Sequence, residues 1–203
     1  DPNDLGFLYN NNSRNYYSFL CWNDFTAGKY FIRKWISAEI YYEELYKPKL
    51  FSYGGLGLET VATFKNFLTV GLDANVNPFG EVDHFESRNF GNEVRFKPNF
   101  SVGGFYSTDY SKRFALDLRF WYKQFMHSSQ KGSNFVISPR VRLSDRMFLV
   151  FRTKWDFIIS DYGYVRILDE AYSDQIILGF RDRLITENSL QSEFIFTKRM
   201  GVD

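Results

Sequence analysis

The alternation of apolar and polar residues is the dominant pattern in this chain. Residues 114–127 carry it most clearly, because every second residue from Phe114 to Tyr122 is apolar. The positions between them include Asp117, Arg119 and Lys123. Successive side chains of a strand point to opposite faces, so this period of two predicts a long strand with one apolar and one charged face.

The same pattern recurs along the chain and predicts nine antiparallel strands. They cover residues 7–25, 30–47, 51–63, 67–78, 94–109, 114–127, 134–143, 147–168 and 174–197. Alternate connections are short, at 26–29, 65–66, 111–113, 144–146 and 198–201. The connections at the other end are generally longer, as at 79–93 and 128–133. Short turns at one end and longer loops at the other are typical of outer-membrane barrels.

The alternation also assigns a lipid-facing side to most strands. The apolar side includes Leu72, Val76, Leu118, Phe135, Phe151, Phe157, Leu184 and Leu190. Asp182 interrupts it, so we expect this residue near or beyond the membrane edge. The strand at 51–63 is the least regular, because Gly54, Gly55 and Gly57 blur its alternation.

Composition strengthens the membrane interpretation. Aromatic residues make up 20% of the chain, an excess that a barrel places on its lipid face and in interfacial girdles. We therefore predict an all-β fold, an antiparallel up-and-down transmembrane β-barrel in an outer membrane, in contact with its lipid. Bacterial single-chain barrels have even strand numbers. We accordingly expect residues 1–203 to be an incomplete barrel segment, with closing strands outside them.

Several other functions lack support in the sequence. The net charge of +1 argues against a nucleic-acid partner. The single cysteine, Cys21, allows neither an internal disulfide nor a cysteine metal cluster. No HExxH, P-loop, dinucleotide-binding or GxSxG motif is present. We expect neither an enzyme nor a cofactor.

The polar faces of the predicted strands carry many charges, which we expect to line a lumen. These residues are Arg95, Lys97, Asp117, Arg119, Lys123, Arg140, Arg142, Arg152, Lys154, Asp156, Arg181, Arg183 and Glu187. Further carboxylates that offset the basic residues are Glu39, Glu59, Asp73 and Glu193. One interpretation is a basic ladder that favours anionic solutes, as charged rings do in pores. The other, which we favour, is a lumen braced by pairs of arginine and carboxylate.

Two histidine regions are weaker candidates for chemistry. Glu81, Asp83 and Glu86 could supply oxygen ligands to Ca²⁺, although their spacing fits no EF-hand. Asp83 and His84 could instead activate a water molecule. His127 with Ser129 could form a base and nucleophile, since both point to the same face of a strand. A solvated acidic loop and a polar loop entrance are the simpler interpretations.

Several segments resemble a Bacteroidota family of outer-membrane barrels known only as a domain of unknown function. The similar segments are 3–7, 105–117, 137–140, 163–165 and 198–201. Members of that family typically carry an upstream β-sandwich that is similar to a carbohydrate-binding module. The resemblance implies a barrel and an outer-membrane location, and it supplies no catalytic or ligand residues.

The sequence thus favours a passive pore, or a structural subunit that works with other proteins of an outer-membrane complex. One alternative is a secreted carbohydrate-binding β-protein whose aromatic residues form a core and a stacking platform. A second is a hydrolase embedded in a barrel, using His127 or the loop with Asp83 and His84.

Overall fold

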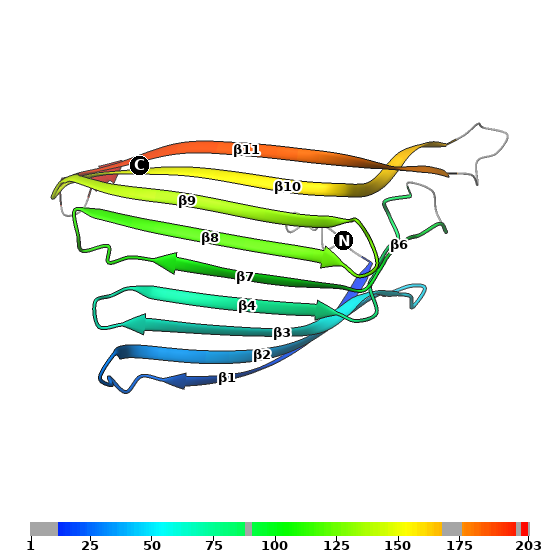
Figure 1. Cartoon of the computed structure of the whole chain (residues 1–203), viewed down its shortest axis with the longest axis horizontal. Coiled ribbons are helices and arrows are strands. Elements are labelled where there is room, and N and C mark those ends of the chain that lie inside the picture. The colour runs from blue at the N-terminus through cyan, green and yellow to red at the C-terminus, as the bar shows by residue number, and fades with distance from the viewer. Residues whose placement is uncertain (1–11, 88–90, 168–175, 198–199, 203) are drawn as a thin grey trace.

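The structure, a computed structural model, describes residues 12–87, 91–167, 176–197 and 200–202. Within these ranges twelve strands form one antiparallel sheet. Figure 1 shows the long strands side by side. The long strands are β1 (Ser13–Asp24), β2 (Phe31–Leu45), β3 (Phe51–Phe64), β4 (Thr69–Asn77), β7 (Asn99–Ser107), β8 (Phe114–Phe125), β9 (Lys131–Ser144), β10 (Met147–Ile167) and β11 (Ile176–Thr197). Three strands of three residues complete it, namely β5 (Glu81–Asp83), β6 (Val94–Phe96) and β12 (Met200–Val202).

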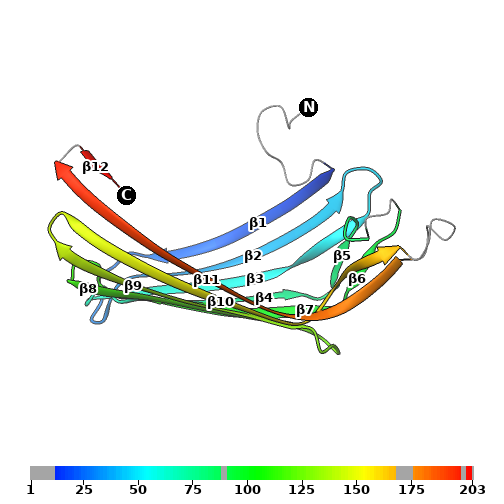
Figure 2. The same cartoon turned by 90° about the horizontal axis from the view of Figure 1, so that it is seen from above.

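Each long strand pairs with its neighbour in the chain, in the order β1-β2-β3-β4-β7-β8-β9-β10-β11-β12. The predicted all-β, up-and-down antiparallel order is therefore confirmed. The sheet is open rather than closed, since β1 and β12 lie at its two ends. Figure 2 shows that it curves into a trough, with β1 on one raised margin and β11 and β12 on the other.

Cross-strand register shows how the alternation divides the residues between two faces. Directly paired residues of an antiparallel sheet lie on the same face. One row of such pairs runs from β4 to β10 through Leu72, Gly104, Phe120, Phe135 and Trp155. The adjacent row, on the opposite face, runs through Asp73, Gly103, Trp121, Asn134 and Asp156. The predicted separation into an apolar and a charged face is thus present across the sheet.

The apolar face is exposed instead of packed. Leu72 is 59% exposed, Phe157 44% and Leu184 62%. Within the described ranges, the buried hydrophobic residues are only Leu45, Val61, Val94, Ala115, Phe125 and Val136. The chain exposes 14403 Å², against ~10,000 Å² for a compact soluble protein of its mass. The described residues therefore form a single-layer sheet without a central hydrophobic core.

The polar face is the concave one. A hollow of about 570 Å³ lies on it, lined by residues of β4, β8, β9 and β10. The segment between β4 and β7, which carries β5 and β6, also lies on this side, as Figure 2 shows. Glycines on the concave face leave room for the side chains of neighbouring residues to lie against the sheet. At Gly103, for example, a Cβ would come within 2.7 Å of the Asp73 carboxylate.

The prediction of one continuous strand at 94–109 is wrong. This segment is divided into β6 and β7 by Lys97 and Pro98. Proline has no N–H for a ladder hydrogen bond, and the carbonyl of Pro98 accepts the N–H of Met126 across the sheet instead. The sequence also missed β5 and β12, since three residues are too few for a detectable period. The strand at 134–143 starts earlier, at Lys131. Residues 7–11, 168, 174 and 175 of the predicted strands lie outside the described ranges.

A bulge in β10 changes its alternation. Ile158 pairs with Arg183, yet Asp161 pairs with Arg181, so β10 contains one extra residue there. Ser160 takes the positive φ of 53° that this arrangement requires. Asp182 accepts the N–H of Ser160 at 2.8 Å. Asp182, which interrupts the apolar pattern, therefore stabilises the bulge.

Candidate functional site: the charged concave face

The register places most of the predicted charged residues on the concave face. Those residues are Asp117, Arg119 and Lys123 of β8, Arg140 and Arg142 of β9, Arg152, Lys154 and Asp156 of β10, and Arg181, Arg183 and Glu187 of β11. One row of direct pairs contains Arg119, Val136, Lys154 and Glu187. Neighbouring strands thus contribute both charge signs to one surface.

Arg95 and Lys97 do not belong to this row, because β7 begins only at Asn99. Arg95 lies on β6 and pairs with Glu93 at 2.5 Å, with its side chain 74% exposed. The ammonium group of Lys97 donates to the carbonyl of His127 at 2.8 Å. Arg95 therefore lies on a short strand beside the main meander and Lys97 lies between β6 and β7, so neither residue extends the row of charges on β8–β11.

Part of the charged face is braced by ion pairs. Lys154 Nζ lies 2.6 Å from Asp156 and 3.5 Å from Glu187. Asp161, which the bulge turns to this face, lies 3.0 Å from Arg181 and 2.9 Å from Arg183. Asn134 donates a further hydrogen bond to Asp156. These contacts match the bracing interpretation.

Tyr110, in the β7–β8 turn, organises a second group that the sequence did not single out. Its hydroxyl donates to Asp117, which also accepts from Ser107 at 2.6 Å. The guanidinium of Arg140 lies 5.2 Å from the Tyr110 ring and 4.7 Å from that of Phe148. Burial raises the pKa of the Tyr110 hydroxyl, and its hydrogen bond to Asp117 raises it further. The group fixes Arg140 by ring contact.

Arg119 and Arg152 differ from the other basic residues of the concave face. Both line the hollow of about 570 Å³, and both side chains are exposed. Neither forms a hydrogen bond or an ion pair within 4.0 Å in the part of the chain that the structure describes. Bracing therefore does not account for these two guanidinium groups.

The carboxylates concentrate on the other side of the trough. Glu39, Glu59 and Asp73, from β2, β3 and β4, line a second hollow of about 190 Å³. Tyr17 donates to Glu39 at 2.6 Å. Asp73 lines both hollows, so they adjoin. The concave face is accordingly acidic over β2–β4 and predominantly basic over β8–β10.

The carboxylates of the predicted calcium loop have separate partners. Glu81 accepts from Lys123 at 2.5 Å, Asn77 at 2.9 Å and Asn99 at 3.0 Å. Asp83 accepts the N–H groups of Phe85 and Glu86, and Glu86 accepts that of Tyr164 on β10. Across residues 12–87, 91–167, 176–197 and 200–202, no group of three His, Cys, Asp or Glu residues is placed to hold a metal ion. Glu81 and Glu86 therefore anchor the segment between β4 and β7 to the sheet, and Asp83 forms a turn within that segment.

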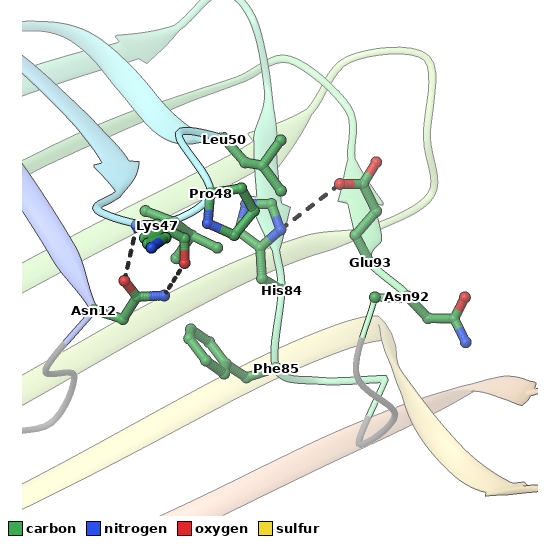
Figure 3. Close-up of a pocket in the computed structure, with 10 residues that line it drawn as sticks. Asn12, Lys47, Pro48, Leu50, His84, Phe85, Asn92 and Glu93 are labelled. Atoms are coloured by element: carbon green, nitrogen blue, oxygen red, sulfur yellow. Dashed lines mark hydrogen bonds and ion pairs between the residues drawn. The ribbon is translucent and has the colours of Figure 1, made fainter.

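His84 lies in a pocket at the rim of the sheet (Figure 3). This pocket, of about 340 Å³, is enclosed by the β2–β3 connection, the segment after β5 and Asn12. The imidazole Nε2 lies 2.9 Å from the carbonyl of Phe51, and Nδ1 lies 3.7 Å from Glu93. Asn12 holds Lys47 by two backbone contacts, at 2.9 and 3.0 Å. The partner of His84 is Glu93, and the carboxylate of Asp83 instead accepts backbone N–H groups.

His127 and Ser129 lie in the connection between β8 and β9 and not in a strand. His127 has a positive φ of 52° in the β8–β9 connection, which ends the strand alternation assumed for the pair. The hydroxyl of Ser129 lies 3.0 Å from that of Ser160. Among the described residues, none forms a hydrogen bond with the His127 imidazole.

Comparisons with known proteins give a family. No helix of the described residues is long and apolar enough to cross a membrane. No curated protein and no solved structure matches the chain. A family model described as "Domain of unknown function (DUF5916)" matches residues 1–203. The model spans the whole sequence, and the chain therefore belongs to this family.

Proposed function

We propose that this chain forms part of the wall of a transmembrane β-barrel in an outer membrane. The observation that carries the proposal is the exposed apolar face, on which Leu20 is 79% and Leu190 70% exposed. Exposed apolar patches of this extent mark interaction surfaces. The hydrocarbon of a lipid bilayer is the environment that suits a curved, single-layer apolar face reaching from β1 to β11.

Strand length supports the same environment. The shortest strands of the meander, β4 and β7, have nine residues each. At ~3.3 Å per residue they extend for ~30 Å, the thickness of the hydrocarbon core. The β10–β11 hairpin runs past its neighbours at the loop end of the sheet (Figure 1). We infer that this end lies outside the bilayer.

The described sheet has free edges at β1 and β11, which a barrel in a membrane must close. Among the described residues, one side of β1 has no partner strand, and β12 pairs only with the last residues of β11. In hydrocarbon each unsatisfied backbone group costs several kcal/mol. We therefore propose that further strands pair with β1 and β11 and close the barrel.

Within such a barrel the concave face supports a passive pore. Its hollow is lined by charged and amide side chains, and a water-filled lumen solvates such groups. A structural subunit of an outer-membrane complex is the second candidate. The ion pairs of Lys154 and Asp161 and the anchored segment between β4 and β7 favour it.

Fractionation and conductance measurements on the full-length protein test these proposals. We expect it to stay with membranes in alkaline carbonate and to need detergent for extraction. Release into aqueous buffer would contradict the membrane location. Reconstituted in planar bilayers, a pore gives steady single-channel currents. Correct insertion without any current would reject the pore and favour the structural subunit.

A further inference from the structure

We propose that Arg119 and Arg152 form a binding site for a small organic oxyanion, a solute with a carboxylate or phosphate group. The site lies in the hollow of about 570 Å³ on the concave face. A role in permeation rests on the proposed pore, whereas binding itself requires only the folded sheet.

The sheet register brings the two arginines to one side of the hollow. Arg119 of β8 pairs directly with Val136 of β9, which pairs with Lys154 of β10. Arg152 lies two residues before Lys154 in the same strand, so its side chain leaves the same face. Val136, on β9 between them, is only 8% exposed. The two arginines therefore lie on β8 and β10, on either side of β9 and on the same face of the sheet.

Their lack of partners distinguishes them from the other cations nearby. Lys154 is compensated by Asp156 and Glu187, and Arg140 lies between two aromatic rings. Arg119 and Arg152 form no hydrogen bond and no ion pair within 4.0 Å among the described residues, and they interact with Glu59 and Asp156 at longer range. A guanidinium presents five N–H donors in a planar fork that matches carboxylate and phosphate oxygens. Two such forks can bind one oxyanion group.

The remaining lining suits a ligand with a carbon skeleton. Trp121 and Asn134 pair directly and both line the hollow. A Cβ at Gly132 would lie 3.6 Å from the Trp121 ring, so the ring borders a strand position without a side chain. The volume falls in the range of small-molecule pockets, ~300–1,000 Å³. An apolar ring and an amide beside two arginines fit a hydroxylated acid or a sugar phosphate.

The acidic side of the trough limits where an anion can rest. Glu39, Glu59 and Asp73 line the adjoining hollow and repel negative charge. In the hollow of about 570 Å³ itself, Asp156 is compensated by Lys154, and Asp73 lies at the β4 edge. An anion is therefore attracted to the β8–β10 side. The arrangement predicts one localised site instead of a uniformly basic lumen.

Equilibrium dialysis with the full-length protein in detergent micelles tests the site. The probes are radiolabelled glucuronate and inorganic phosphate, with glucose as the uncharged comparison. We expect saturable binding of at least one anion and none of glucose. In the R119Q/R152Q double variant we expect the affinity to fall about ten-fold or more, as for the loss of charged hydrogen bonds. The matched control R146Q, in the exposed β9–β10 turn, should bind as the wild type does.

The two probes separate the possible sources of the oxyanion. Binding of glucuronate alone indicates a carboxylate ligand, and binding of phosphate alone indicates a phosphate group. Saturable binding of neither probe would overturn the site. Affinity retained by the double variant, with unchanged far-ultraviolet circular dichroism, would overturn it as well.

Planar-bilayer recordings on the same preparations distinguish this proposal from the pore. Saturable binding without conductance keeps the site and rejects the pore. Conductance without saturable binding keeps the pore and rejects the site. If both proposals hold, glucuronate or phosphate should reduce the chloride current of the wild type and leave that of R119Q/R152Q unchanged.

Discussion

The ammonium group of Lys123 lies 2.5 Å from the carboxylate of Glu81. This contact joins β8, in the middle of the sheet, to the segment between β4 and β7. Because Glu81 also accepts from Asn77 and Asn99, one carboxylate fixes the segment against the concave face. The segment reaches β10 as well, where Glu86 accepts the N–H of Tyr164.

Replacement of Glu81 by glutamine should loosen this segment. The variant keeps the size of the side chain but removes the charge that three donors share, and leaves Lys123 unpaired. We expect a local loss of about 1–2 kcal/mol, the range of charged hydrogen bonds at partly buried sites. Hydrogen exchange of the amides between β4 and β7 measures it.

Glu93→Gln is the matched control for Glu81→Gln. Glu93 contacts the largely exposed Arg95 and, at 3.7 Å, His84, both within the same segment, so the loss of its charge should cost less than about 1 kcal/mol. Equal protection in the wild type and in Glu81→Gln would show that Lys123 does not hold the segment.

Adjacent residues of β8 should respond in opposite ways to a change of polarity. Leu118 pairs with Tyr106 and Ile137 on the apolar face, whereas Arg119 points to the concave face. In a lipid-facing sheet, Leu118→Arg places a charge in hydrocarbon, at a cost of about 2–4 kcal/mol. Arg119→Leu removes an exposed charge from the water side. The folded fraction after insertion into vesicles compares them, and equal assembly would contradict the assignment of faces.

The bulge of β10 should depend on Asp182. Asp182→Ala leaves the Ser160 N–H without its acceptor, at an expected cost of about 1–2 kcal/mol. Ser160→Gly is the contrasting variant, because glycine adopts a positive φ without steric strain and should be tolerated. Unfolding by urea in detergent micelles measures both. Similar midpoints for the wild type and Asp182→Ala would indicate that the bulge stands without the carboxylate.

Curvature of the sheet should depend on glycines of the concave face. A methyl group at Gly71 would overlap the Phe105 ring, which lies across that position. Gly71→Ala should therefore displace the ring and destabilise the fold by about 1–3 kcal/mol, as overpacking does. Gly28→Ala is the control, since nothing lies within 4 Å of the added atom. A matching decrease of the urea midpoint in both variants would argue against this packing role.

Local alternation was sufficient for much of the architecture. Residues 114–127 predicted β8 and its two faces, because the period of two needs no knowledge of partners. The antiparallel order followed from the short turns between successive strands, and most of the charged concave residues followed from the alternation. It was inapplicable to Arg95 and Lys97, where Pro98 ends the strand, and to β5 and β12, which are too short to carry a period.

The sequence by itself determined which residues share a face, since that depends only on neighbours along one strand. The sequence also predicted that the charged face lines a lumen, and only the tertiary structure decided which side of this face is acidic and which charges are compensated. Those properties depend on register, bulges and contacts over long sequence separations, as between Lys123 and Glu81 or Asp161 and Arg183. Alternation from Ile158 would place Asp161 on the apolar face, and the bulge at Ser160 returns it to the arginines. For the same reason, no pattern along the chain distinguishes the unpaired Arg119 and Arg152 from their paired neighbours.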